Sequence, residues 1–290
     1  MDKNIQTFLG CTADYESADA VLFGAPFDGT TSFRPGTRFG PSAIRSESFG
    51  IETYSPYCDR DLTHCSVFDG GDLELPFGNT QRVLEQIQEY TQRLLADNKR
   101  FVMLGGEHLV TLGALREVVK HYPDLHVIHL DAHTDLRTEY LGEELSHSTV
   151  MYQAWKLLGD GRIHQFGIRS GEKYEFEFAG EHTGLRKFDL QGFEKTVLEL
   201  KDKPVYVTLD LDVLDPSIFC GTGTPEAGGA TFRELMDVVL QLHQLNIVGC
   251  DINELSPHYD QSGSSTAVAC KITREILLQI VGFSTGFSSH

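Results

Sequence analysis

Three side chains with metal-binding chemistry follow one apolar run at a spacing of two residues. The segment VIHLDAHTDLRTEY (127–140) carries Asp131, His133 and Asp135 directly after four mostly apolar positions. A single Asp or His at a strand end often caps a turn, but three at period 2 can point to the same side of an extended chain. Burying two carboxylates without a partner is costly. We therefore expect a cation beside these side chains.

Short apolar runs alternate with amphipathic segments along the whole chain, without a linker or repeat. This alternation favours a single α/β domain, residues 1–290, with a mostly parallel sheet covered on both faces. The predicted helix 229–245 begins with Thr231 as N-cap and has Glu234 three residues later, which is the pattern of a capping box. The predicted strands are 20–26, 100–106, 125–133, 162–169, 204–216 and 246–255, and the predicted helices are 79–98 and 229–245.

Several of these strands end in an acid or a histidine. One run leads to His108, another to Asp210 and Asp212, and a third to Glu254. Ligands of open α/β sheets bind at the carboxyl ends of strands, so we expect these residues to converge. The predicted metal ligands are His108, Asp131, His133, Asp135, Asp210 and Asp212. Four carboxylates and two imidazoles suit two divalent cations about 3.5–4 Å apart. Ligand hardness favours manganese and leaves iron, cobalt and zinc open.

Composition excludes several classes of protein. The 290 residues include 42 acids and 24 Lys or Arg, a formal net charge of -18, which argues against nucleic acid as a partner. The excess acid serves solubility or attracts a cationic substrate. No apolar run approaches the roughly 18–20 residues of a membrane span, and the N-terminal segment lacks a signal-peptide core. We expect a cytoplasmic protein with no membrane partner.

The chain resembles the ureohydrolase family, which includes arginases and agmatinases, and within it the bacterial agmatinases. The resemblance covers nearly the whole chain. The matching motifs are PFDGTTSFRPGTRFGPSAIR (26–45), GGEH (105–108), DAHTDLR (131–137), SH (146–147), DLDVLDP (210–216), GTGTPEAGG (221–229) and NELSP (253–257). This resemblance implies a three-layer α/β/α fold with a mostly parallel eight-stranded sheet. It also implies two Mn²⁺ per subunit and a homo-oligomer, either a trimer or a hexamer.

The resemblance implies a division of the ligands between two metals. One metal would take His108, Asp131, Asp135 and Asp210, and the other would take His133, Asp131, Asp210 and Asp212. A hydroxide that bridges the metals would donate a hydrogen bond to Asp135. This hydroxide would attack the guanidinium carbon of the substrate. His147 would shuttle the proton to the leaving amine, although Ser148 follows it where relatives usually have Gly. Glu254 would pair with the guanidinium, and Thr224 would contact the same group.

The substrate that this resemblance favours is agmatine, hydrolysed to putrescine and urea as in putrescine and polyamine biosynthesis. Arg137 occupies a position where arginases carry an Asn for the α-carboxylate, so those contacts look absent. The resemblance implies that Glu226 is an acid common in agmatinase-type members and that Glu172 falls close to a family acid used in amine recognition. Both would suit a distal ammonium. Cys220 stands where the family usually has Pro. It is either a substitution without functional effect or a redox-sensitive thiol near the metals.

Three alternatives remain open. The chain could hydrolyse another guanidino compound, such as guanidinobutyrate or arginine, and Arg137 is the basic residue that would favour an acidic substrate. It could be a deacetylase-like amidohydrolase, although that chemistry uses one zinc and fewer carboxylates. It could also bind a polyamine or metal without catalysis, although such a protein would be expected to have lost ligands or the proton shuttle.

Overall fold

The computed structural model describes residues 6–281, so residues 1–5 and 282–290 of the predicted domain lie outside the described residues. One sheet runs through the molecule, and every neighbouring pair of its strands is parallel. In spatial order its strands are β4 (Val67–Asp72), β1 (Ala20–Ala25), β5 (Arg100–Gly105), β10 (Asn246–Asn253), β9 (Pro204–Asp210), β6 (His126–Leu130), β7 (Ile163–Ile168) and β8 (Gly184–Lys187). The eight-stranded parallel sheet is as predicted.

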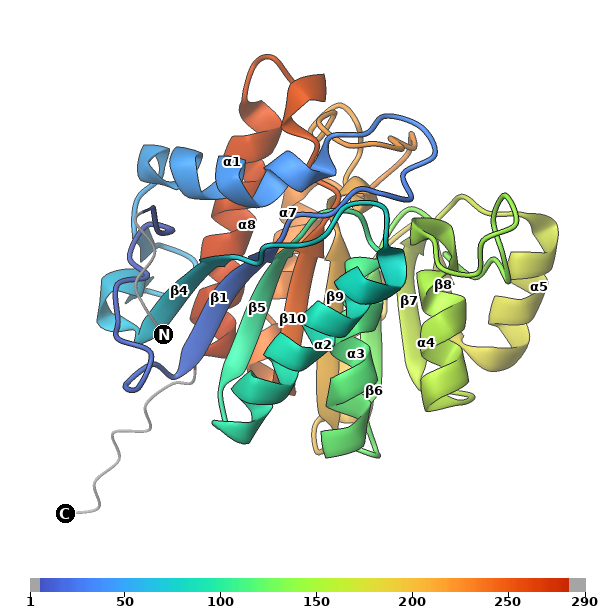
Figure 1. The fold of residues 1–290 in the computed structure, drawn as a ribbon, viewed down its shortest axis with the longest axis horizontal. Helices are drawn as coiled ribbons and strands as arrows, with labels where there is room; N and C mark the ends of the chain where they lie inside the picture. Colours follow the sequence, from blue (N-terminus) through green and yellow to red (C-terminus); the bar gives the residue numbers. More distant parts are fainter. Residues whose placement is uncertain (1–5, 282–290) are drawn as a thin grey trace.

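Helices cover both faces of this sheet (Figure 1). One layer contains α2 (Thr80–Ala96), α3 (Val110–His121), α4 (Val150–Leu158) and α5 (Lys173–His182). The other contains α1 (Gly40–Glu47), α6 (Phe193–Leu200), α7 (Phe232–Val239) and α8 (Ser264–Ile280). Two short strands, β2 (Tyr54–Ser55) and β3 (Arg60–Asp61), form a separate antiparallel pair. The arrangement is the three-layer α/β/α fold that was expected.

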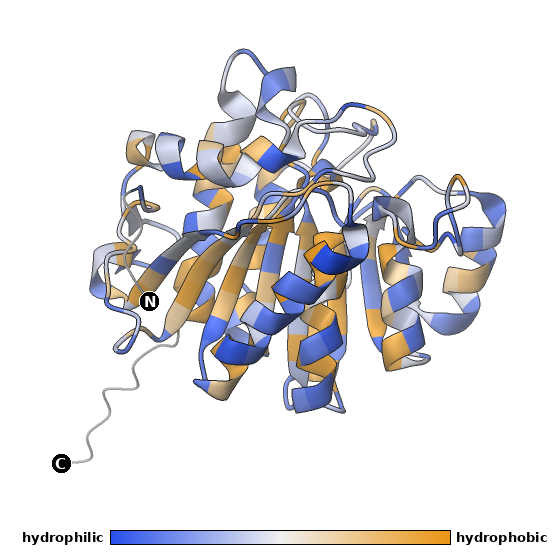
Figure 2. Cartoon of the chain, in the orientation of Figure 1, coloured by the Kyte–Doolittle hydropathy of each residue, from blue (hydrophilic) through white to orange (hydrophobic). Residues whose placement is uncertain are grey.

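The two faces of the sheet support two separate hydrophobic cores, because successive strand side chains point to opposite faces. In β1, Leu22 packs with the layer of α1, α6, α7 and α8, whereas Val21 and Phe23 pack with the layer of α2 and α3. Both faces are therefore apolar, and Figure 2 shows the strands as mostly hydrophobic beneath helices with polar outer surfaces. This burial explains why these strands read as continuous apolar runs.

The predicted strands are confirmed, but several end earlier than predicted. β9 ends at Asp210, because the carboxylate of Asp210 caps the short 3-10 turn Leu211–Val213. The predicted helix 229–245 divides into α7 and a 3-10 turn, Leu242–Gln244. The capping box of Thr231 and Glu234 at the start of α7 is confirmed. The edge strands β4 and β8 were not predicted, because their sequences, VFDGGD and GLRK, are too polar to resemble buried strands.

The order of the strands decides where the functional residues meet. β5, β10, β9 and β6 are consecutive neighbours in the middle of the sheet. These are the strands that precede His108, Glu254, Asp210 and Asp131 in the chain. Since parallel strands have their carboxyl ends at the same edge, four distant segments open onto one place.

Candidate metal centre and substrate pocket

The structure brings the six predicted metal ligands together at the carboxyl edge of the central strands. Five of them are buried and His133 is partly buried. The Nδ1 atom of His108 lies 3.0 Å from Asp131 Oδ2 and 3.4 Å from Asp210 Oδ2. It lies 3.2 Å from Asp135 Oδ2. His108 is thus the centre of a first group of carboxylates.

A second group forms around His133 and shares one acid with the first. Its Nδ1 atom lies 3.0 Å from Asp212 Oδ2 and 3.4 Å from Asp131 Oδ1. The two oxygens of Asp131 therefore face different histidines. A carboxylate shared in this way suits a pair of divalent cations, as the ligand count predicted.

The period-2 spacing suggested that the segment with Asp131, His133 and Asp135 is an extended chain, but the structure shows a turn there. β6 ends at Leu130, and Asp135 has a left-handed backbone with φ of 52°. The Asp131 carboxylate accepts a hydrogen bond from the backbone N–H of His133 at 2.5 Å, which closes a tight turn. The three side chains converge because this turn folds them around the site, and the prediction that a pleated strand aligns them was wrong.

The charge balance of this cluster supports a bound cation. Among residues 6–281, the only ion-pair partners within 4 Å of Asp131, Asp135, Asp210 and Asp212 are histidines. Burial and the adjacent carboxylates Asp212 and Asp131 raise the pKa of Asp210 well above its ordinary value. Burial opposes a charge on His108, yet the surrounding carboxylates raise its pKa well above the usual range. A site that favours positive charge this strongly fits a divalent metal.

The buried Nδ1 of His108 is a second observation that fits a bound cation. It has no hydrogen-bond partner within the described part of the chain, although three carboxylates surround it. An imidazole nitrogen amid carboxylate oxygens is a donor set for a divalent transition metal. The residues present therefore fit the metal centre that the sequence predicted.

His129 is a member of this cluster that sequence reasoning missed. It is fully buried, and its Nε2 lies 2.8 Å from Asp131 Oδ2. Its Nδ1 lies 3.0 Å from the side-chain amide of Gln165, whose Nε2 also donates to the Thr134 carbonyl at 2.9 Å. Because the Gln165 amide donates to Nδ1, the ring hydrogen of His129 is on Nε2 and points at Asp131. His129 therefore supports Asp131 and is not itself a ligand. Its position two residues before Asp131 is the sequence feature that could have identified it.

His147 lies beside the cluster at the start of the turn His147–Thr149. Its Nδ1 lies 3.0 Å from the backbone carbonyl oxygen of Thr30, which accepts a hydrogen there. Its Nε2 is therefore the basic nitrogen, and it lies 3.3 Å from Ser32 Oγ. Burial lowers the pKa of His147, partly opposed by the charge of Asp135. The ring is oriented to exchange a proton through Nε2.

The cluster forms the floor of a cavity of about 320 Å³. This volume suits a small ligand. Residues of the metal cluster, His147, Thr224 and Glu254 all line it. Glu254 is buried and accepts a hydrogen bond from the backbone N–H of His108 at 2.8 Å. Burial and nearby Glu107 raise the pKa of Glu254 well above normal, so this carboxylate also favours a cationic partner.

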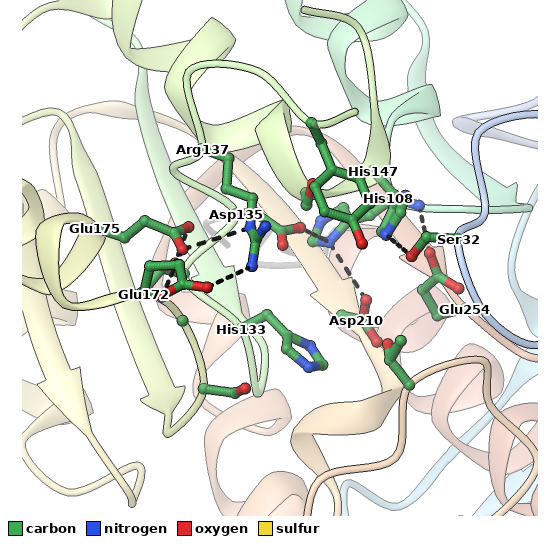
Figure 3. Close-up of a pocket in the computed structure, with 16 residues that line it drawn as sticks. Ser32, His108, His133, Asp135, Arg137, His147, Glu172, Glu175, Asp210 and Glu254 are labelled. Atoms are coloured by element: carbon green, nitrogen blue, oxygen red, sulfur yellow. Dashed lines mark hydrogen bonds and ion pairs between the residues drawn. The ribbon is translucent and has the colours of Figure 1, made fainter. Parts of the chain in front are cut away.

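The outer end of the cavity carries a charged group of Arg137, Glu172 and Glu175. Arg137 Nη2 lies 3.4 Å from Glu172 Oε1, and Arg137 Nε lies 3.7 Å from Glu175 Oε2. Figure 3 shows these three side chains on one side of the pocket, away from Ser32 and Glu254. Glu175 was missed in the sequence, although it completes a capping box with Glu172 at the start of α5.

Two other residues singled out in the sequence lie elsewhere. Glu226 does not line this cavity, although its backbone carbonyl accepts hydrogen bonds from the Arg169 guanidinium. Cys220 is an exposed free thiol outside the lining of the cavity. The geometry therefore brings Glu172, and not Glu226, to the outer end of the pocket.

Comparison with known proteins places the chain in a family. The model of the Arginase family matches residues 18–279. The chain belongs to the arginase family. It is 48% identical to the agmatinase of Bacillus subtilis over 280 residues, which cover 95% of this chain and 97% of the relative. The ureohydrolase resemblance predicted from the sequence motifs is therefore confirmed.

Solved structures give the same relationship. A Clostridium difficile protein assigned as an agmatinase superimposes with a TM-score of 0.91 at 50% identity, covering 92% of this chain and 99% of that one. The agmatine ureohydrolase of Thermoplasma volcanium superimposes with a TM-score of 0.87 at 31% identity, covering 96% and 94%. In addition, no helix within residues 6–281 is long and apolar enough to cross a membrane.

Proposed function

We propose that the protein hydrolyses agmatine to putrescine and urea with two Mn²⁺ per subunit. The observation that carries this proposal is one cavity lined by the acid-rich cluster, His147 and Glu254 in a chain 48% identical to a bacterial agmatinase. The cluster suits the metals, His147 suits proton transfer and Glu254 suits a guanidinium. A metal-binding protein without catalysis would not need His147 oriented toward the cavity.

The metal ligands of this proposal are those predicted from the sequence. One ion would be held by His108, Asp131, Asp135 and Asp210, and the other by His133, Asp131, Asp210 and Asp212. When bound, the two ions supply Lewis acidity, which lowers the pKa of coordinated water. The oxygen-rich donor set supports manganese over softer metals. A deacetylase-like enzyme with one zinc would leave several of these buried carboxylates uncompensated.

The guanidinium of the substrate would lie between Glu254 and the cluster. Its positive charge compensates the buried Glu254 carboxylate, whose pKa is raised by burial and Glu107. Two parallel hydrogen bonds from a guanidinium to this carboxylate would fix the orientation of its carbon. The Thr224 hydroxyl lies 3.4 Å from Asp212 and lines the same space, so it can also contact the group.

Two residues of the chain would handle protons in this reaction: Asp135 would accept a hydrogen bond and His147 would transfer a proton. Asp135 lines the cavity, and its carboxylate can accept a hydrogen bond from the attacking water. Attack forms a tetrahedral carbon, and the C–N bond to the butylamine chain then breaks. The leaving nitrogen takes a proton from Nε2 of protonated His147, because Nδ1 remains hydrogen-bonded to Thr30. In the net reaction, the two protons of the water end on the leaving amine, one of them through His147, which returns to its starting form. The products are putrescine and urea.

The outer end of the cavity favours a substrate with a positive distal group. Two carboxylates, Glu172 and Glu175, accompany the single guanidinium of Arg137, so this group has a negative balance. A distal ammonium would be attracted to it, and a carboxylate would be repelled. Agmatine ends in an ammonium, whereas guanidinobutyrate ends in a carboxylate that only Arg137 would favour.

Three broader properties belong to the same proposal. We propose one domain over residues 1–290, a cytoplasmic location and a homo-oligomer of three or six copies. The continuous sheet across the described residues supports the single domain. The resemblance to ureohydrolases supports the oligomer, which sedimentation of the purified protein would test. Putrescine formation would give the protein its role in polyamine synthesis.

The deciding experiment is urea release by Mn²⁺-loaded protein with agmatine, arginine and guanidinobutyrate measured in parallel. We expect urea from agmatine at a rate far above the other two. The variant His147→Asn should be strongly impaired, while His164→Asn, which changes a histidine outside the cavity, should behave like the wild type. Urea from guanidinobutyrate alone would overturn the substrate, and acetate from an acetylated polyamine without urea would overturn the reaction class.

A further inference from the structure

A buried polar network lies behind His108, on the side of the ring opposite the carboxylates. His108 Nε2 lies 2.8 Å from Thr208 Oγ1, and Thr208 Oγ1 lies 2.6 Å from Asp251 Oδ1. Thr208 and Asp251 are register partners on the neighbouring strands β9 and β10. Both are completely buried within otherwise apolar strand sequences, VYVTL and IVGCDI. Polar side chains at such positions are costly unless they serve a purpose.

The direction of each hydrogen bond follows from the available donors. A carboxylate can only accept, so the short contact with Asp251 takes the single hydrogen of the Thr208 hydroxyl. Tyr206 Oη and Asn253 Nδ2 also donate to Asp251, each at 2.6 Å. With its own hydrogen committed, Thr208 Oγ1 accepts from His108. The hydrogen on the side of the ring facing Thr208 is therefore on Nε2.

This arrangement decides which ring nitrogen of His108 carries the lone pair. A neutral imidazole has one N–H and one lone pair. If Thr208 holds the hydrogen at Nε2, the lone pair is on Nδ1, the atom within 3.4 Å of Asp131, Asp135 and Asp210. A lone pair among carboxylates is repelled unless a proton or a metal cation lies between them. With a divalent metal present, the same orientation makes Nδ1 a ligand.

We propose that Thr208 and Asp251 are positioning residues that hold His108 with its hydrogen on Nε2, so that Nδ1 is available to a divalent metal. Asp251 orients the Thr208 hydroxyl, and Thr208 orients His108. Neither residue lines the cavity, so each acts through His108 without touching the substrate. This assignment rests on the proposed metal role of His108.

The variant Thr208→Val tests the assignment, because valine has the shape of threonine and lacks the hydroxyl. We expect the affinity of the full-length protein for Mn²⁺ to fall about 10–100-fold, measured by competition with a chromogenic chelator. Thr208→Ser keeps the hydroxyl and should restore affinity to near that of the wild type. Thr91→Val is the matched control, since Thr91 is fully buried in α2 and its hydroxyl has no partner among the described residues.

A spectroscopic measurement separates positioning from general destabilisation. In protein loaded with diamagnetic Zn²⁺ and labelled with ¹⁵N-histidine, the hydrogen-bonded Nε2–H of His108 should give a downfield proton signal that exchanges slowly with water. This signal should be lost in Thr208→Val and retained in Thr208→Ser and Thr91→Val. Asp251→Asn should also weaken Mn²⁺ binding, because an amide can donate to Thr208 and turn the threonine hydrogen toward His108.

The possible outcomes distinguish this inference from the proposed function. If the wild type binds Mn²⁺ and releases urea while Thr208→Val binds Mn²⁺ equally well, the role of Thr208 is overturned and the proposed function stands. Equal losses in Thr208→Val and Thr91→Val would also overturn it. Absence of Mn²⁺ binding by the wild type would overturn the metal centre and this inference with it. Weakened binding rescued by serine, in a protein that releases no urea, would support the positioning role and reject the reaction.

Discussion

Two clusters of acids in this molecule differ in what neutralises them. Near the sheet edge at β1 and β4, Asp69 and Asp72 pair with the buried Arg45, whose Nε lies 2.9 Å from Asp69 Oδ2. Asp69 also accepts a backbone hydrogen bond from Phe8 at 2.7 Å. At the carboxyl ends of the central strands, the acids around His108 have no Lys or Arg partner among the described residues. The same residue type is therefore used in two ways.

The contrast separates a structural cluster from a binding site. Removing one partner from a closed ion pair leaves a charge uncompensated and destabilises the fold. Removing an acid such as Asp210, whose pKa is raised by burial and by the adjacent acids Asp212 and Asp131, relieves repulsion in the metal-free protein. Stability and activity should therefore respond in opposite ways in the two regions. Four predictions follow from this contrast, from the largest expected effect to the smallest.

Asp131→Asn should have the largest effect on activity. This change removes the carboxylate shared by the two histidine groups, so urea release should fall by about 10³–10⁴-fold, corresponding to the several kcal/mol that a metal pair supplies. In the metal-free protein, Asp210→Asn should make unfolding no easier, because burial and the adjacent acids raise the pKa of Asp210. Activity is measured as urea release with excess Mn²⁺. Retention of more than a tenth of the rate would contradict a shared metal ligand.

Asp69→Asn should have the largest effect on stability. It leaves Arg45 buried with only Asp72, so the free energy of unfolding should fall by about 3–5 kcal/mol. Denaturant unfolding of the metal-loaded protein measures this loss, and urea release per folded molecule should stay near that of the wild type. The exposed acid Glu181 offers a control, since Glu181→Gln should change stability by less than about 0.5 kcal/mol.

Glu107 is a third kind of buried acid, held by hydroxyl and backbone donors without a cation. Thr30 and Thr31 donate to it, but burial raises its pKa from 4.5 to about 7. The folded state keeps a proton that the unfolded chain releases, so this contribution is full below pH 4.5 and lost as pH rises through about 7. The loss amounts to at most about 3 kcal/mol.

The comparison of wild type with Glu107→Gln isolates this effect. Chemical unfolding of the metal-free proteins at pH values between 4 and 8 should show a smaller decline of stability in the variant. Asp210 and Glu254, whose pKa values are also raised by burial and neighbouring acids, should leave a residual decline in both proteins. Parallel curves for the two proteins would mean that Glu107 does not hold a proton in the folded state.

Glu172→Gln should have the smallest effect. Its side chain is 60% exposed and paired with Arg137, so solvent screens its charge. The KM for agmatine should rise about two- to fivefold with kcat unchanged, equivalent to about 0.4–1 kcal/mol. Steady-state kinetics with agmatine and guanidinobutyrate measure the difference. A variant that improves with agmatine would show that Glu172 does not attract the distal ammonium.

Much of the fold was predictable because its signals are local. The central strands are continuous apolar runs, since both of their faces are buried, and the capping box of Thr231 and Glu234 specifies the start of α7. The edge strands β4 and β8 were not predictable, because one neighbour and partial exposure allow polar and glycine residues there. Their place in the sheet depends on pairing with distant segments.

Some features of the candidate site were also predictable from the sequence, and others were not. Residue type and position at strand ends determined the six metal-ligand candidates, because parallel strands present their carboxyl ends at one edge. The turn at Asp135 and the Gln165 contact that prevents His129 from acting as a ligand depend on backbone torsion and a neighbouring strand. No spacing rule encodes either of them.

The amino-acid sequence by itself determined the family, the parallel sheet and the convergence of acids and histidines at one edge. Only the tertiary structure decided which nitrogen of His108 faces the carboxylates and which acid reaches the outer end of the pocket. The physical reason is that donor and acceptor assignments, and the pairing of Arg137 with Glu172, depend on atoms from separate elements within a few ångströms. Those distances exist only once the sheet has formed.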